Sequence, residues 1–115
     1  MSDMKSRGTA GEDLAARFLE YKGLTILARN FSCRYGEIDL IARNGEDTVF
    51  VEVKLRRNAD YGYAAEAVTP SKRAKLKRTA LFWLQRFGEV PSRFDVLEIY
   101  DEYTPVRIHW IKNAF

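Results

Sequence analysis

A chain of 115 residues, of which 46% are hydrophobic, is long enough for one domain with one core and too short for two. Its single cysteine, Cys33, and single histidine, His109, exclude a disulfide framework, a thiolate metal cluster and any site that needs two imidazoles. A metal site must therefore be built mainly from carboxylates, which favour magnesium, manganese or calcium. The net charge of +3 is a weak indication of a polyanionic partner.

The N-terminal segment, residues 1–8, is polar and lacks the apolar core of a signal peptide. No apolar run approaches the length needed to span a bilayer. We therefore expect a cytoplasmic protein with no membrane partner.

The first half of the chain predicts a helix followed by three strands. Residues 9–22 form the helix, with Thr9 as its N-cap, Glu12 closing a capping box and Gly23 ending it. Three strands are expected at residues 24–29, 36–43 and 48–55. The Asn44-Gly45 pair between the second and third strands is a strong hairpin signal.

The second half predicts a helix and two more strands. Thr69 caps the helix, Pro70 takes its first position and Gly88 ends it. Its apolar stripe comprises Leu76, Ala80, Trp83, Leu84 and Phe87. Strands follow at residues 93–100 and 106–111, the last at an edge of the sheet. The order α-β-β-β-α-β-β, with the second helix as a parallel crossover, predicts an α/β fold in a single domain (residues 1–115) with a mixed sheet flanked by helices.

Four charged side chains gather on one face of the predicted hairpin. Side chains alternate along a strand, so Glu37 and Asp39 share a face of the second strand, and Glu52 and Lys54 share a face of the third. A two-residue turn would place Glu37 opposite Glu52, and a four-residue loop would place Asp39 there. All four side chains end on the same face in both registers.

Three carboxylates so close together repel each other, and a divalent cation would remove that cost. Beside such an ion, Lys54 can orient a water or stabilise charge on a phosphate, as in metal-assisted phosphodiester hydrolysis. The alternative is a solvated charged face on which Lys54 neutralises one carboxylate. The charges interrupt the apolar run Val49-Phe50-Val51, and a buried charge without a partner is costly, so the pattern favours a functional site.

The segments Gly36-Glu37-Ile38-Asp39-Leu40-Ile41-Ala42 and Val49-Phe50-Val51-Glu52-Val53-Lys54-Leu55-Arg56 resemble the signature of the YraN-like proteins. This bacterial family is assigned to the PD-(D/E)XK nuclease superfamily and is related to archaeal Holliday junction resolvases. Gly11-Glu12 and Arg93-Phe94-Asp95-Val96 also fit, so the resemblance covers nearly the whole chain. It implies a restriction-endonuclease-like core and a magnesium or manganese cofactor.

The resemblance also implies roles for individual residues. Asp39, Glu52 and Lys54 would be catalytic, and Asp39 and Glu52 would bind the metal together with Glu12 of the first helix. Glu37 would support them as an outer or optional ligand, unless it is a solvated carboxylate at the strand end. Arg73 departs from the pattern, because relatives often carry glutamine there, and any role transferred to that position is in doubt.

Basic residues near these strands predict contacts with nucleic acid. Lys72 and Arg73 lie in the first turn of the second helix, where the helix N-terminus favours phosphate. Arg56 and Arg57 open a loop that also carries tyrosines, and such loops grip phosphates and stack on bases. In each case the alternative is an ordinary solvated surface.

These observations predict a metal-dependent endonuclease that hydrolyses phosphodiester bonds in DNA, in branched or repair intermediates. The alternative is a non-catalytic nucleic-acid-binding module on the same fold, and an interaction protein is a third reading that fits the basic helix start least well. RNA as the ligand stays open. A homodimer would suit the cutting of two strands, but the sequence shows no interface.

Overall fold

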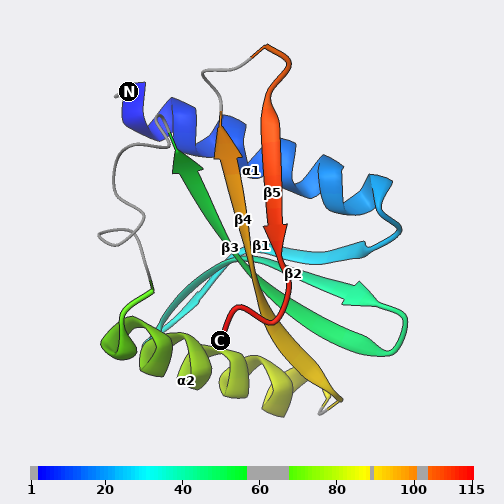
Figure 1. Cartoon of the computed structure of the whole chain (residues 1–115). Coiled ribbons are helices and arrows are strands. Elements are labelled where there is room, and N and C mark those ends of the chain that lie inside the picture. The colour runs from blue at the N-terminus through cyan, green and yellow to red at the C-terminus, as the bar shows by residue number, and fades with distance from the viewer. Residues whose placement is uncertain (1–2, 57–67, 89, 101–103) are drawn as a thin grey trace.

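A computed structural model describes residues 3–56, 68–88, 90–100 and 104–115 (Figure 1). Its elements, in chain order, are α1 (Asp3–Tyr21), β1 (Thr25–Cys33), β2 (Gly36–Asn44), β3 (Asp47–Arg56), α2 (Pro70–Phe87), β4 (Ser92–Tyr100) and β5 (Arg107–Ile111). The predicted α/β fold and its order of elements are confirmed. In the described part of the chain, no helix combines the length and apolar character needed to cross a bilayer.

The strands form one mixed sheet in the order β1-β2-β3-β4-β5. Neighbouring strands run antiparallel, except for β3 and β4, which are parallel. These two strands are parallel because α2 carries the chain from the C-terminal end of β3 back to the end of the sheet where β3 begins. Thr69 accepts a hydrogen bond from the backbone N–H of Lys72 and Pro70 opens the helix, as predicted. The predicted crossover and the edge position of β5 are therefore correct.

The two helices cover opposite faces of the sheet, and each face has its own apolar core (Figure 1). Alternation along β3 divides its side chains between them: Val49 and Val51 pack with α1, and Phe50 packs with α2. On the α2 face, Glu52 follows Phe50 at the same period. The polar positions of β3 therefore lie on the same side of the sheet as α2.

The first helix and the first strand are longer than predicted. The helix begins at Asp3, so Thr9 lies within it and the predicted capping box is wrong. The polar run 3–8 carries no apolar stripe, which is the signal that locates a helix in a sequence. β1 continues to Cys33, and its pairing with β2 is interrupted by a register shift at Leu27, between Ile26 and Ala28.

Two predicted core positions differ in the structure. Alternation along the second strand predicts that Ile38 shares a face with Leu40. Ile38 instead packs in the α2-side core, because the pairing of β2 with β3 ends at Leu40–Val51 and regular alternation ends with it. Phe87 was expected in the core of α2 and is 60% exposed. It occupies the last position of the helix and stacks against Trp83, with 4.1 Å between the ring centroids.

Candidate active site

The hairpin register decides which carboxylates meet. Arg43 pairs with Thr48 and Asn44 with Asp47, which leaves Gly45-Glu46 as the turn. Gly45 has φ 65°, a left-handed conformation that glycine adopts without strain. The register is the one expected for the longer loop. Just beyond its last pair, Leu40–Val51, the side chains of Asp39 and Glu52 hydrogen-bond to each other.

Asp39 and Glu52 form a carboxyl pair on the α2 face. Asp39 Oδ2 accepts a hydrogen bond of 2.8 Å from the backbone N–H of Val53, which fixes its orientation. Burial, the hydrogen bond with Glu52 and the charge of Glu52 raise the pKa of Asp39 from 3.8 to about 8. Asp39 therefore holds a proton at neutral pH that the pair shares.

Two lysines converge on Glu52 from different elements. Lys72 Nζ, from the first turn of α2, lies 2.9 Å from Glu52 Oε2, and Lys54 Nζ, two residues along β3, lies 3.9 Å from the same oxygen. Burial acts to raise the pKa of Glu52, but hydrogen bonds with Asp39 and Lys72 and the charge of Lys54 outweigh it and lower the pKa. Glu52 is therefore the ionised member of the pair.

Lys72 is held in its charged form by the same contacts. Burial acts to lower the pKa of Lys72, but the hydrogen bond with Glu52 and the charge of Glu52 raise it above its ordinary value. The side chain is 44% exposed, so it spans from solvent to the buried carboxylate, whose own side chain is 8% exposed. A cation in this position can meet a phosphate that approaches from solvent.

A cavity of about 280 Å³ lies over the carboxyl pair. It is lined by Gly36, Glu37, Asp39, Glu52, Lys72, Lys75 and Leu76. Four predicted residues therefore line this cavity, namely Glu37, Asp39, Glu52 and Lys72, and Glu37 is exposed at the start of its strand. A fifth, Lys54, lies beside Glu52 on β3. Lys75 was not predicted in this cavity, although its position three residues after Lys72 puts both on one face of the helix.

The donor set fits a hard divalent cation. Magnesium is commonly held by one or two carboxylates and completes its shell with waters and substrate phosphates. Asp39 and Glu52 supply two such carboxylates, and the raised pKa of Asp39, caused by burial and by Glu52, reflects a repulsion that a cation would relieve. Among the residues that the structure describes, no group of three or more acidic, histidine or cysteine side chains is placed to hold a metal ion.

Glu12 lies apart from the carboxyl pair in this structure. Its Oε1 accepts a hydrogen bond of 3.0 Å from the side-chain amide of Asn30 on β1. Its charge is near enough to contribute to the raised pKa of Asp39, as the smallest of the causes, after burial and the contacts with Glu52. Its role as a third ligand stays a prediction.

The basic residues expected to bind nucleic acid occupy different settings. Arg73 is exposed, donates to the carbonyl of Val68 and lies over the ring of Phe115. Arg56 is 9% exposed and forms a buried ion pair with Glu98, with Nη2 3.0 Å from Oε2. Arg57 lies outside the described residues. Of the three that the structure describes, Lys72 has the most direct contact with the carboxyl pair.

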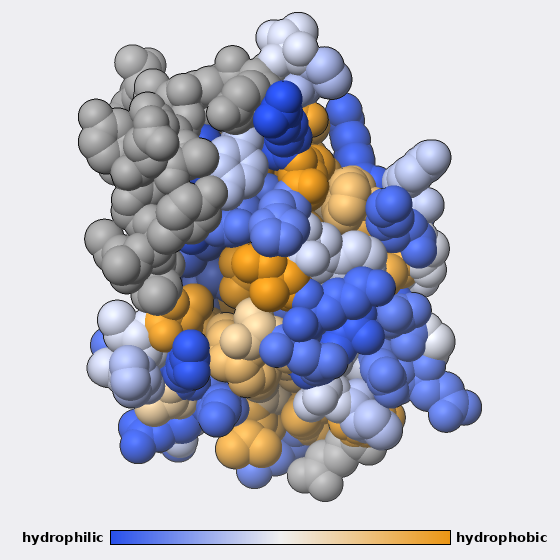
Figure 2. All heavy atoms as spheres, viewed as in Figure 1, coloured by the Kyte–Doolittle hydropathy of each residue, from blue (hydrophilic) through white to orange (hydrophobic). Residues whose placement is uncertain are grey.

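A second cavity, of about 420 Å³, is lined by Lys54, whose ammonium lies 3.9 Å from Glu52 of the first cavity. Glu98 on β4 and His109 on β5 line it, and sequence reasoning missed Glu98 as a site residue. The available signal was a carboxylate inside the apolar strand β4, of the kind that drew attention to Glu52 on β3. In Figure 2 this side of the molecule shows apolar surface bordered by hydrophilic side chains.

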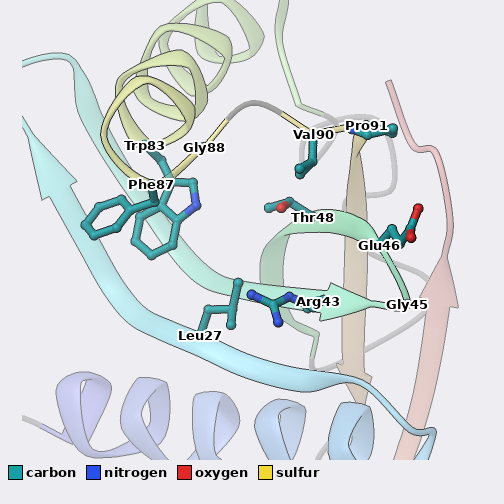
Figure 3. A pocket seen from close by; sticks show the side chains of 10 residues that line it. All are labelled: Leu27, Arg43, Gly45, Glu46, Thr48, Trp83, Phe87, Gly88, Val90 and Pro91. Carbon is teal, nitrogen blue, oxygen red and sulfur yellow. The ribbon is translucent and has the colours of Figure 1, made fainter.

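A larger cavity, of about 650 Å³, lies elsewhere, between the β2–β3 turn and the end of α2 (Figure 3). Its walls combine apolar side chains such as Trp83 and Phe87 with single charges from Arg43 and Glu46. It contains neither a carboxyl pair nor any predicted site residue. Its size alone therefore does not make it the candidate active site.

Comparison with known proteins gives the family of the chain. The model of the uncharacterised protein family UPF0102 matches residues 11–99, which include Asp39, Glu52, Lys54 and Lys72. The chain belongs to the UPF0102 family. A UPF0102 protein of Neisseria gonorrhoeae is 50% identical over 109 residues, covering 93% of this chain and 92% of the relative.

Two further UPF0102 proteins extend the match to nearly full length. The relative in Methylobacillus flagellatus is 45% identical over 112 residues, 97% of this chain and 98% of its own. The relative in Geobacter sulfurreducens is 50% identical over 115 residues, 96% of this chain and 89% of its own. The carboxyl pair and its lysines thus lie within the part of the UPF0102 chain that defines the family.

Proposed function

We propose that this UPF0102 protein is a magnesium- or manganese-dependent nuclease of the PD-(D/E)XK type that hydrolyses phosphodiester bonds in DNA, with branched or repair intermediates as its substrates. The observation that carries the proposal is the Asp39–Glu52 carboxyl pair, which shares its cavity with Lys72 and stands beside Lys54. A carboxyl pair and two ammonium groups match what cleavage of an anionic ester requires.

The protein's own groups divide the work. Asp39, fixed by the N–H of Val53, and the ionised Glu52 present oxygens to a cation. A bound divalent cation supplies Lewis-acid polarisation of the phosphate and a water of lowered pKa. Lys72, which is paired with Glu52 and reaches solvent, is placed to hold a phosphate oxygen.

Lys54 is the better candidate for stabilising charge at the reacting phosphate. Its side chain is 18% exposed, and its ammonium lies 3.9 Å from Glu52 Oε2, which is near the carboxyl pair but beyond hydrogen-bond distance. Rigid placement on β3 preorganises the amine, which is the source of most electrostatic stabilisation in enzymes. Glu37 at the cavity rim can accept hydrogen bonds from water around the ion.

One contact favours the alternative, a non-catalytic nucleic-acid-binding module. Lys72 forms a 2.9 Å ion pair with Glu52, which balances the charge of the carboxylate without a metal ion. In such a module the lysines would bind phosphate and the carboxylates would only hold the lysines. The two functions differ in whether a metal is needed and whether a bond is cut.

A cleavage panel separates them. Linear, nicked, flapped and four-way DNA is incubated with the purified protein and magnesium or manganese, and cut strands are resolved on a denaturing gel. We expect metal-dependent products that disappear in Glu52→Ala and in Lys54→Ala, with both variants still folded by circular dichroism. Glu46→Gln, in the hairpin turn, is the control and should cut like the wild type.

Cleavage by the Glu52→Ala, Lys54→Ala double variant at the wild-type rate would contradict the site. Binding of DNA without cleavage of any substrate, unchanged or tighter in Glu52→Ala, would instead support the binding module.

A further inference from the structure

We propose that the cavity beside Lys54 binds an unpaired nucleobase of the strand that is cut. This inference rests on the proposed nuclease function and adds the substrate class, a strand with unpaired nucleotides at the cut. The cavity has a volume of about 420 Å³, which lies within the roughly 300–1,000 Å³ range of small-ligand pockets. It opens on the α2 face of the sheet beyond the start of the helix.

The floor of this cavity is polar, and three basic residues, Lys54, Arg56 and Arg73, line the cavity together with Glu98. Glu98 is 5% exposed, and its two oxygens have different partners: Oε2 lies 3.0 Å from Arg56 Nη2, and Oε1 lies 3.0 Å from His109 Nδ1. Each carboxylate oxygen can accept more than one hydrogen bond. A base carries N–H donors on its Watson–Crick edge, from which Glu98 can accept, whereas a phosphodiester has no donor to offer this carboxylate.

The walls favour a flat, apolar ligand. Val68, Val96, Ile111 and Ala114 line the cavity together with Phe115. The ring of Phe115 stacks on Phe94, with 4.9 Å between centroids, and Arg73 lies over Phe115 at 5.3 Å. Aromatic rings and guanidinium groups are the surfaces on which single-stranded bases stack.

The position of the cavity would place the bound base next to the phosphodiester bond that is cut. Lys54 lines the cavity, and its ammonium is 3.9 Å from Glu52 in the carboxyl pair. A phosphate held at the pair would place the next nucleotide over the cavity. A base can enter such a recess only when it leaves the duplex stack, and this costs least where the base is already unpaired. Flaps, junction ends and single strands meet that condition.

A binding comparison tests the pocket without any cleavage. Wild-type protein in EDTA is titrated into fluorescently labelled oligothymidylate and into an abasic oligonucleotide of the same length and phosphate number, and anisotropy gives both dissociation constants. We expect the base-containing strand to bind at least about fivefold more tightly, the lower end of what one stacked base contributes. Ile111→Trp fills the cavity and should abolish this preference while leaving affinity for the abasic strand unchanged.

Two further variants provide a control for added bulk and a second test of the cavity. Leu81→Trp adds the same bulk at a position on α2 that is 53% exposed and should keep the preference. His109→Ala, at a side chain that is 64% exposed, removes a polar group at the mouth with little risk to folding and should reduce the preference. Thermal unfolding confirms that each variant is folded.

Equal affinity of the wild type for the two strands, or a preference that persists in Ile111→Trp, would overturn the base pocket. An equal loss of affinity for both strands in Ile111→Trp would show that the cavity takes a phosphate, and would overturn it as well. Failure of the nuclease proposal has a different signature, since it appears as absence of metal-dependent cleavage while the base preference is intact.

Discussion

Replacement of Asp39 by asparagine is expected to stabilise the metal-free protein. Asp39 holds a proton in the folded state, because burial and Glu52 raise its pKa from 3.8 to about 8. Asparagine mimics this protonated form: its oxygen can accept from the N–H of Val53, and its amide can donate to Glu52. The variant therefore keeps the native contacts. It also removes a carboxyl group whose ionisation at neutral pH favours the unfolded state.

The size of the effect follows from the pKa values. Between pH 3.8 and about 8 the folded state binds more protons than the unfolded state, so the stability of the wild type falls as pH rises through this window. At pH 7 the ceiling is about 4 kcal/mol, at about 1.4 kcal/mol for each pKa unit. Solvent contact and the shared proton with Glu52 reduce it, and we expect about 2 kcal/mol, or roughly 8 °C in Tm.

Urea and thermal unfolding of the wild type and Asp39→Asn in EDTA, at several pH values from 4 to 9, measure the effect. The difference in unfolding free energy should be small near pH 4, grow with pH and level off above about pH 8, the pKa of Asp39 raised by burial and Glu52. Glu37→Gln, an exposed carboxylate of the same cavity, is the control and should stay within about 0.5 kcal/mol of the wild type. Lower stability of Asp39→Asn than of the wild type across this range would refute the reasoning.

Three other substitutions or additions should give measurable changes. In differential scanning fluorimetry at pH 8, manganese should raise the Tm of the wild type and leave the Tm of Glu52→Gln unchanged, because only the wild type keeps both carboxylates of the cavity. Equal shifts would place the ion elsewhere. Lys72→Ala should reduce the salt slope of DNA binding by about one unit relative to the wild type, and an unchanged slope would remove Lys72 from the phosphate contacts. Asp95→Asn should lower the unfolding free energy by about 3 kcal/mol in urea titration, because fully buried Asp95 accepts from Arg93, from Trp110 Nε1 and from the N–H of Asn113; a neutral outcome would show that these bonds are replaceable.

The local signals of the sequence were sufficient for most of the fold. Thr69, Pro70 and Gly88 delimited the second helix because capping acts over a few residues, and alternation along β3 assigned Val49, Val51 and Glu52 to their faces. The same reasoning failed where local patterns carry no information. The polar start of α1 has no apolar stripe, and the face of Ile38 depends on where β2 separates from β3.

The sequence by itself determined that a carboxyl-rich face would form on the β2–β3 hairpin, since the period of a strand places Asp39, Glu52 and Lys54 together in either register. Only the tertiary structure decided which register holds, that Lys72 from α2 reaches the same oxygen as Lys54, and that Glu98 lies under a second cavity. The physical reason is distance along the chain. Lys72 and Glu98 belong to elements that meet β3 through the crossover and the parallel pairing with β4, and the packing of those elements depends on the whole core.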